Sequence, residues 1–139
     1  MTVFRRNPAM IAARAAADLA AIKVQGLIQI NAKAGQTRQL YITTSPGQDM
    51  IYIAKEREAL DFLAAPVDDL KTYPLLAAEV GLTAQTAWEL AQVWANVSVY
   101  WRGIAAQIEG ARIRAIARIK AATDVDEIAA ELAAFRPLS

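Results

Sequence analysis

The chain has 139 residues, a net charge of +1 and neither cysteine nor histidine. Without these two residue types it can form no disulfide, no thiolate or imidazole metal site and no catalytic triad built on histidine. The balanced charge gives no support to nucleic-acid binding, and no stretch approaches the roughly 20 consecutive apolar residues of a membrane span.

The first third of the chain predicts one alanine-rich helix. Residues 1–7 show no periodicity and are expected to form a flexible or docking leader. Asn7 followed by Pro8 is typical of a helix start, because Asn caps well and Pro fits the first turn. Apolar residues at helical spacing then predict a helix over about residues 8–38, within a single helical domain that spans residues 8–139.

The middle of the chain predicts two shorter helices. The β-branched run Tyr41–Thr44 favours a short extended connector, and Ser45-Pro46 is expected to start a helix over residues 46–64. Its buried side is expected to carry Met50, Ile53, Leu60 and Leu63. Tyr73-Pro74 then starts a helix over residues 74–80, which Gly81 ends.

A long helix over about residues 83–122 is the element on which the fold is expected to be built. Its N-cap is either Thr83 or Thr86, the latter together with Glu89. At 1.5 Å per residue it would be roughly 60 Å long. Apolar residues recur along one side at steps of four and three, as helical packing requires: Leu90, Trp94, Val97, Trp101, Ile104 and Ile108.

A second side of this long helix is also apolar. Glycine inside a helix costs about 1 kcal/mol relative to alanine, so Gly103 and Gly110 indicate a close approach by another backbone. A helix that is apolar on two sides is either sandwiched within its own domain or used for assembly. The residues of this second side are Trp88, Val99, Gly103, Ala106, Gly110, Ile113 and Ala117.

A last helix over residues 124–135, capped by Thr123 and Asp124, completes the expected fold. Every long periodic segment has helical spacing. The predicted class is therefore all-α: a helical hairpin or small bundle built along the long helix of the C-terminal half, with little or no β-structure.

Carboxylates are the remaining groups that could carry catalysis or bind a metal. The run Asp124–Glu127 resembles the start of a calcium loop but lacks its glycine and distal glutamate, so a capping role is expected instead. Glu56 and Glu58 lie two apart on a helix and point in different directions. Arg112 lies close to the apolar stripe and is expected to pair with a carboxylate. We therefore expect no enzyme, no cofactor and no metal site; a small carboxylate-based enzyme or ligand-binding bundle is the least favoured alternative.

Several short motifs together resemble a known group of proteins. The segments are Ile30–Ala64, Tyr73–Gly81 and Ile108–Arg112, and the most recognisable motifs are Tyr41-Ile42-Thr43, Pro46-Gly47-Gln48, Tyr52, Lys55, Tyr73-Pro74 and Glu79-Val80-Gly81. Their order and spacing resemble small helical proteins encoded in phage and prophage tail modules, commonly beside tail-fibre genes. The resemblance covers about Gly26 to Ile128 and does not extend to the segment before Gly26, which could be a docking arm.

This resemblance implies a structural role without an active site. The expected function is a structural component of a bacteriophage tail, attached to the baseplate or tail-fibre apparatus, assembled in the bacterial host cytoplasm and located in the virion. The alternative is a tail-fibre assembly chaperone that leaves after folding the fibre. Expected partners are other tail proteins and a second copy of the chain, with no nucleic acid and no membrane. The candidate interface residues are Trp88, Trp94, Val99, Trp101, Gly103, Gly110, Ile113, Tyr41 and Tyr52.

Overall fold

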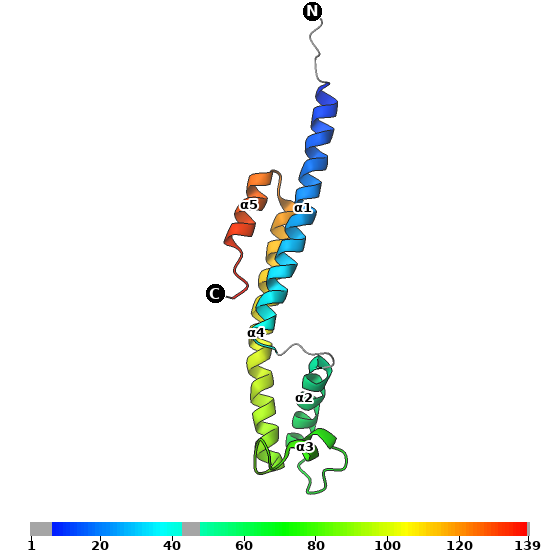
Figure 1. Ribbon diagram of the computed structural model, residues 1–139, viewed down its shortest axis with the longest axis vertical. Coiled ribbons are helices and arrows are strands. Elements are labelled where there is room, and N and C mark those ends of the chain that lie inside the picture. Colours follow the sequence, from blue (N-terminus) through cyan, green and yellow to red (C-terminus); the bar gives the residue numbers. More distant parts are fainter. Residues whose placement is uncertain (1–6, 43–47, 139) are drawn as a thin grey trace, which may run out of the picture. The chain divides into compact units, whose positions relative to one another are not determined.

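The computed structural model describes residues 7–42 and 48–138, which form helices and no β-strand (Figure 1). Between Val80 and Ala84 there is a single isolated bridge. The predicted all-α class is thereby confirmed. The helices are α1 (Pro8–Gln39), α2 (Gln48–Ala64), α3 (Pro74–Glu79), α4 (Ala87–Ala121) and α5 (Val125–Ala134). Of the expected leader over residues 1–7, residues 1–6 lie outside the described residues, as does the expected helix start at Ser45-Pro46.

Helix α4 starts later than the expected range of residues 83–122. After α3, Gly81 adopts a φ of +87°, and its N–H donates to the carbonyl of Ala84 at 2.7 Å. This tight turn uses the backbone up to Thr86, whose hydroxyl accepts from the N–H of Glu89 at 3.1 Å. Thr86 is therefore the N-cap, and a helix start at Thr83 was wrong.

Contacts between residues group the chain into two compact units, where one helical domain was expected. Unit 1 comprises residues up to Arg38 together with Ala106 and beyond, and unit 2 comprises Gln39–Ala105. The long helix α4 contributes its C-terminal part to unit 1 and its N-terminal part to unit 2.

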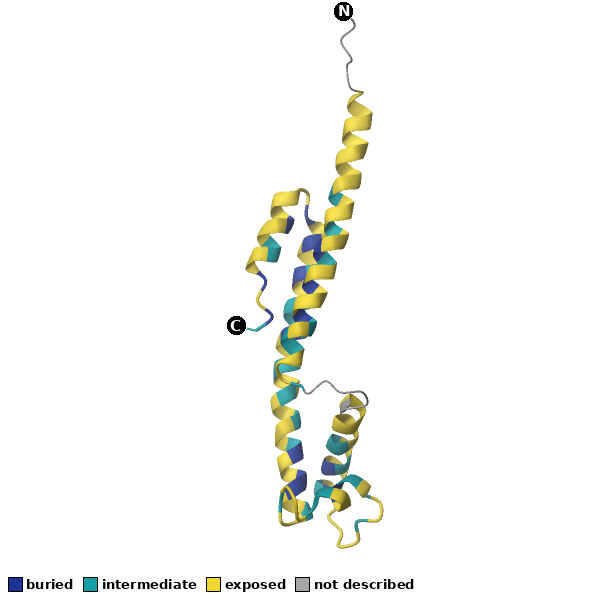
Figure 2. Cartoon of the chain, viewed as in Figure 1, coloured by how far each residue is buried: buried dark blue, intermediate teal, exposed yellow. Residues whose placement is uncertain are grey.

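In unit 1, α1 runs antiparallel to the C-terminal part of α4, and α5 returns beside them. The ammonium group of Lys23 donates to the carbonyl of Lys120 at 2.7 Å, and that of Lys33 donates to the carbonyl of Phe135 at 3.1 Å. Gly26 lies where the three helices converge, because an added Cβ there would meet Ile119 and Ile128 at 3.4 Å. The buried side chains of this unit lie at helical spacing (Figure 2): Ile30, Ala34, Ile108, Ala115, Ile119, Ala122, Ile128 and Phe135.

In unit 2, α2 and α3 pack against the N-terminal part of α4. The buried cluster consists of Ala59, Phe62, Leu76, Leu90, Ala91 and Trp94. Phe62 meets Tyr73 edge to face, with ring centroids 5.5 Å apart, which is a favoured aromatic geometry. The short helix α3 is therefore held by apolar contacts on the side that faces α2.

Two of the expected buried sides are wrong in part. On α4, Leu90, Trp94 and Ile108 are buried as expected, but Val97 is 58% exposed. On α2, Met50 and Ile53 are 76% and 69% exposed, and the helix turns Ala59 and Phe62 inward instead. The reason is the side from which α2 meets α4: Glu56 bonds Ser98 and Arg102, so that the Val97 side stays uncovered.

Candidate interaction surfaces

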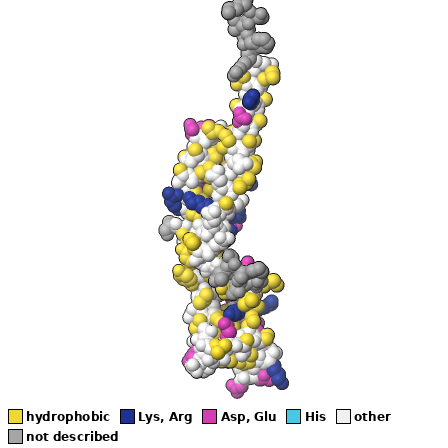
Figure 3. Space-filling view, in the orientation of Figure 1, with side chains coloured by type: hydrophobic (Ala, Val, Ile, Leu, Met, Phe, Trp, Pro, Cys, Tyr) yellow, Lys and Arg dark blue, Asp and Glu magenta, His cyan; other side chains and the backbone are white. Residues whose placement is uncertain are grey.

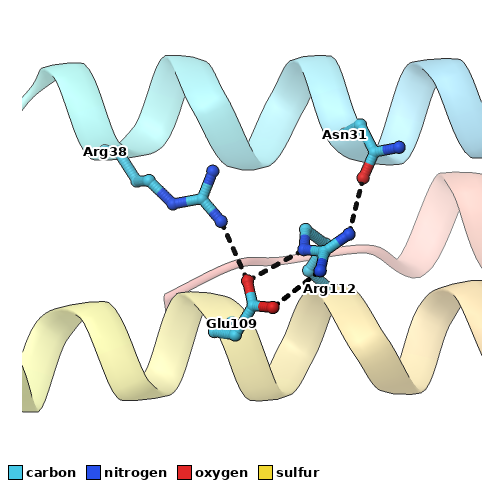
Figure 4. Close-up of polar contacts among 4 residues, drawn as sticks. All are labelled: Asn31, Arg38, Glu109 and Arg112. Carbon is cyan, nitrogen blue, oxygen red and sulfur yellow. Dashed lines mark hydrogen bonds and ion pairs between the residues drawn. The ribbon is translucent and has the colours of Figure 1, made fainter.

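The polar centre of unit 1 is a cluster of two arginines around one carboxylate (Figure 4). Arg112 donates to both carboxylate oxygens of Glu109, at 2.8 Å from Nε and 2.6 Å from one terminal nitrogen. Its other terminal nitrogen donates to Asn31 of α1 at 2.9 Å. Arg38, also of α1, donates to Glu109 at 3.0 Å. The expected pairing of Arg112 with a carboxylate is confirmed.

The electrostatics of this cluster follow from the contacts. The hydrogen bonds from Arg112, together with the charges of Arg112 and Arg38, hold the pKa of Glu109 below its ordinary value of 4.5, although partial burial opposes the shift. The same contact with Glu109 raises the pKa of Arg112. Both oxygens of the Glu109 carboxylate accept from guanidinium groups. The cluster therefore joins α1 to α4.

The carboxylates of α2 are also committed to neighbouring helices. Glu56 points to α4, whereas Glu58 accepts from the backbone N–H groups of Leu75 and Leu76 at 3.1 and 2.9 Å. No side chain of its own caps α3, so Glu58 supplies that cap from another helix. The expectation that Glu56 and Glu58 point in different directions is confirmed.

Lys55 of α2 also makes contacts with neighbouring helices of unit 2. Its ammonium group lies 2.9 Å from Oε2 of Glu79 and 4.9 Å from the centre of the Trp94 ring. That carboxylate oxygen is shielded from solvent, so Lys55 supplies the compensating charge. Trp94 itself is 9% exposed and belongs to the core of unit 2. It is the one candidate interface residue that lies inside its own unit.

The acidic run before α5 caps that helix. Asp124 accepts from the N–H of Glu127 at 2.9 Å, and Glu127 reaches back to the N–H and the hydroxyl of Thr123 at 3.0 and 3.1 Å. Asp124 thereby satisfies one of the free N–H donors in the first turn of α5, and Glu127 binds the residue before the cap. The expected capping role of Asp124 is confirmed, whereas Thr123 does not cap the helix and instead donates to Glu127.

One side of α4 in unit 2 carries exposed apolar residues, with the exposed Gln92 among them. Trp88 and Val99 are 45% and 71% exposed. A Cβ added to Gly103 would meet no atom within 4 Å. These three residues, hereafter the Trp88 side, lie at helical spacing on the part of α4 that is not turned toward α2. Apolar side chains reach the surface in both units (Figure 3).

A groove lies at the Trp88 end of this side. It is shallow, has a volume of about 610 Å³, and is bordered by the end of α2, the connection to α3 and the first turn of α4. Exposed tryptophan beside aliphatic side chains is a composition typical of interaction hot spots. The lining residues are Phe62, Pro66, Val67, Asp68, Leu70, Val80, Thr86, Ala87 and Trp88.

The remaining candidate residues are dispersed. Tyr41 and Tyr52, in unit 2, are 45% and 39% exposed, and Trp101 is half-buried. In unit 1, Ile113 is 53% exposed, and an added Cβ at Gly110 would meet only the guanidinium of Arg114, at 3.1 Å. Of the candidate interface residues in unit 2, only Trp88, Val99 and Gly103 lie together on one exposed side of a helix.

Sequence reasoning did not identify the exposed apolar residues of α2 or Tyr100 of α4 as surface. Met50, Ile53 and Leu60 lie at spacings of three and seven, which the sequence alone reads equally well as a buried side. Tyr100, at 67% exposure, lies between two expected stripes. Only the direction from which α2 meets α4 decides between these readings.

No family model, no curated protein and no solved structure matches this chain. Among the helices of the described residues, none combines the length and the apolar character needed to cross a bilayer. Within the same residues, no three acidic side chains gather as they would around a metal ion.

Proposed function

We propose that the chain is a non-enzymatic structural component of a bacteriophage tail, attached to the baseplate or the tail-fibre apparatus. The observation that carries the proposal is the Trp88 side of α4, where Trp88 and Val99 stay exposed on a long helix. Exposed aromatic and aliphatic residues beside a groove are typical of protein–protein contacts. The resemblance of Tyr41–Lys55 and Tyr73–Gly81 to small tail proteins supports the choice of partner.

The chemistry of the polar residues is consistent with this proposal. Glu56, Glu58 and Glu109 each accept a hydrogen bond from a neighbouring helix. Their roles are therefore to hold the helices of each unit, which leaves the apolar sides to meet partners.

Quantitative mass spectrometry of purified virions tests the proposal. A permanent tail component is present at a fixed number of copies per particle. A tail-fibre assembly chaperone, the alternative, is absent from the virion but bound to the fibre in the lysate before assembly. If the chain were found neither in the virion nor bound to the fibre in the lysate, both the structural-component function and the chaperone function would be contradicted.

A substitution on the Trp88 side makes the test specific. Val99→Asp places a charge on this side and is expected to abolish incorporation into particles, whereas Ile53→Asp on α2 is the matched control. Both side chains are β-branched and mostly exposed, at 71% and 69%, so neither change should unfold unit 2. Equal incorporation of the two variants would remove the Trp88 side as the contact surface.

A further inference from the structure

The N-terminal half of α1 in unit 1 is a helix without cover. From Pro8 to Asp18 every residue is exposed, and up to Ile22 only Leu19 is half-buried. Met10 and Ile11 are 71% and 51% exposed. Helices of this length gain most of their stability from packing on an apolar side, and here the described residues of the chain supply none.

The uncovered side has a definite order of charges. Met10, Arg14, Asp18 and Ile22 follow one another at steps of four, in the series that the buried Gly26 and Ile30 continue where α1 packs against the other helices of unit 1. Neither Arg14 nor Asp18 forms an ion pair with another described residue. An arginine placed four residues before an aspartate is also the weaker order for a pair within one helix.

The order of these charges allows two copies of the segment to pair when they run in opposite directions. In an antiparallel pair of helices with a two-fold axis beside Ala16, Arg14 of each copy faces Asp18 of the other, and Met10 faces Ile22. A parallel pair would bring Arg14 to Arg14 and Asp18 to Asp18. The small Ala17 and Ala21 beside this stripe permit close approach of the two backbones.

We propose that a second copy of the chain covers this side, through antiparallel pairing of the segment Pro8–Ile22 of α1. Two reciprocal Arg14–Asp18 ion pairs fix the register, and Met10, Ile11 and Ile22 provide the apolar contact. The two-fold arrangement is the commonest symmetry of homo-oligomers. The inference does not depend on the tail role proposed above.

Complementary charge variants test the register. In R14D both positions are acidic, and in D18R both are basic, so each variant repels its own copy. Sedimentation velocity over a series of concentrations should show that the unchanged chain self-associates. Each single variant should associate at least about tenfold more weakly, since two exposed ion pairs become two repulsions. An equimolar mixture of R14D and D18R should associate again, because each charge then meets its opposite.

The control is R57D, which makes the same charge change at an exposed residue of α2 and should leave self-association unchanged. At a concentration where every protein is monomeric, circular dichroism should give the same helix content for all variants, because the side chains of Arg14 and Asp18 form no ion pair with a described residue. A chain that stays monomeric throughout, or a mixture that fails to regain association, would overturn the proposal.

Cross-linking tests the direction of the pairing, since the chain has no cysteine of its own. In a mixture of I11C and A21C, antiparallel pairing predicts the mixed disulfide between the two variants after mild oxidation. Disulfides between two copies of the same variant would indicate parallel pairing and contradict the assignment. I53C, exposed on α2, is the control and should form no such link.

Discussion

At the scale of single residues, carboxylates determine how neighbouring helices are joined. Glu109 takes hydrogen bonds from Arg112 on its own helix and from Arg38 on α1. Glu58 of α2 caps α3 with both of its oxygens. Each of these contacts can be removed by a single substitution.

The titration of Glu109 is the first prediction. Its pKa is held below 4.5, chiefly by the Arg112 hydrogen bonds. A carboxylate whose pKa is lowered in the folded chain stabilises the fold above its unfolded-state pKa, and this contribution is lost as the pH falls through the folded value. NMR titration of the Glu109 carboxyl carbon should give a midpoint below 4.5. In Arg112→Gln the midpoint should rise toward the ordinary value.

The cap supplied by Glu58 is the second prediction. Glu58→Ala leaves the N–H groups of Leu75 and Leu76 without an acceptor, and should lower the free energy of unfolding of unit 2 by about 1 kcal/mol. Tryptophan fluorescence in a denaturant titration reports this unit, because Trp88, Trp94 and Trp101 all lie in it. Asp61→Ala, an exposed change on the same helix, is the control. An equal effect of the two changes would mean that the cap contributes nothing.

At the scale of elements, the sequence predicts which segments are helical but not every side that they bury. Alternating steps of three and four place Leu90, Trp94 and Ile108 on one side of α4, and all three are buried. Val97 has the same spacing but stays exposed, because α2 approaches from the side of Ser98. Periodicity defines the sides of a helix, whereas the position of the neighbouring helix decides which of them is covered.

The candidate surfaces were predictable to a similar extent. The second apolar side of α4 was evident from the spacing of Trp88, Val99 and Gly103. The groove beside Trp88 was not, because its other borders come from Phe62 and from Pro66–Leu70, far away in sequence. Such a groove exists only once the connection between α2 and α3 has folded back on α4.

The third prediction is that replacing Gly103 and Gly81 by alanine changes the stability of unit 2 in opposite directions. Gly103 lies inside α4 with open space where a Cβ would be, so Gly103→Ala should stabilise unit 2 by up to about 1 kcal/mol. Gly81 has a φ of +87°, and Gly81→Ala should destabilise it by about 1–2 kcal/mol, since other residues adopt this conformation with strain. Denaturation followed by tryptophan fluorescence measures both. Destabilisation by Gly103→Ala would show that the helix is closely packed at this position after all.

Gly103→Ala also bears on assembly. A glycine that is retained for contact with a partner is costly to the helix but needed by the complex. The variant should therefore be more stable and yet less well incorporated into virions. A variant that is stabilised and fully incorporated would leave Gly103 without a role in assembly.

At the scale of the whole molecule, the chain has two separate apolar cores. Ile30, Ile108, Ile119 and Ile128 form the centre of the core in unit 1, and Phe62, Leu76, Leu90 and Trp94 form that in unit 2. The sequence predicted one helical domain built along α4, whose apolar spacing shows no boundary between the two cores. Continuous apolar spacing on one helix therefore does not show that a single core surrounds it.

Two cores on one chain predict unfolding transitions that respond separately to core substitutions. Ile119→Ala and Leu76→Ala each remove a fully buried side chain, and such changes cost about 2–5 kcal/mol. Leu76→Ala should shift the transition seen by tryptophan fluorescence, since all the tryptophans lie in unit 2. Ile119→Ala should shift a part of the far-ultraviolet circular dichroism transition and leave the fluorescence midpoint nearly unchanged. Each variant is thus the control for the other. If both variants moved both signals together, the two cores would unfold as one cooperative domain, and the helix α4 that they share would be the element that couples them.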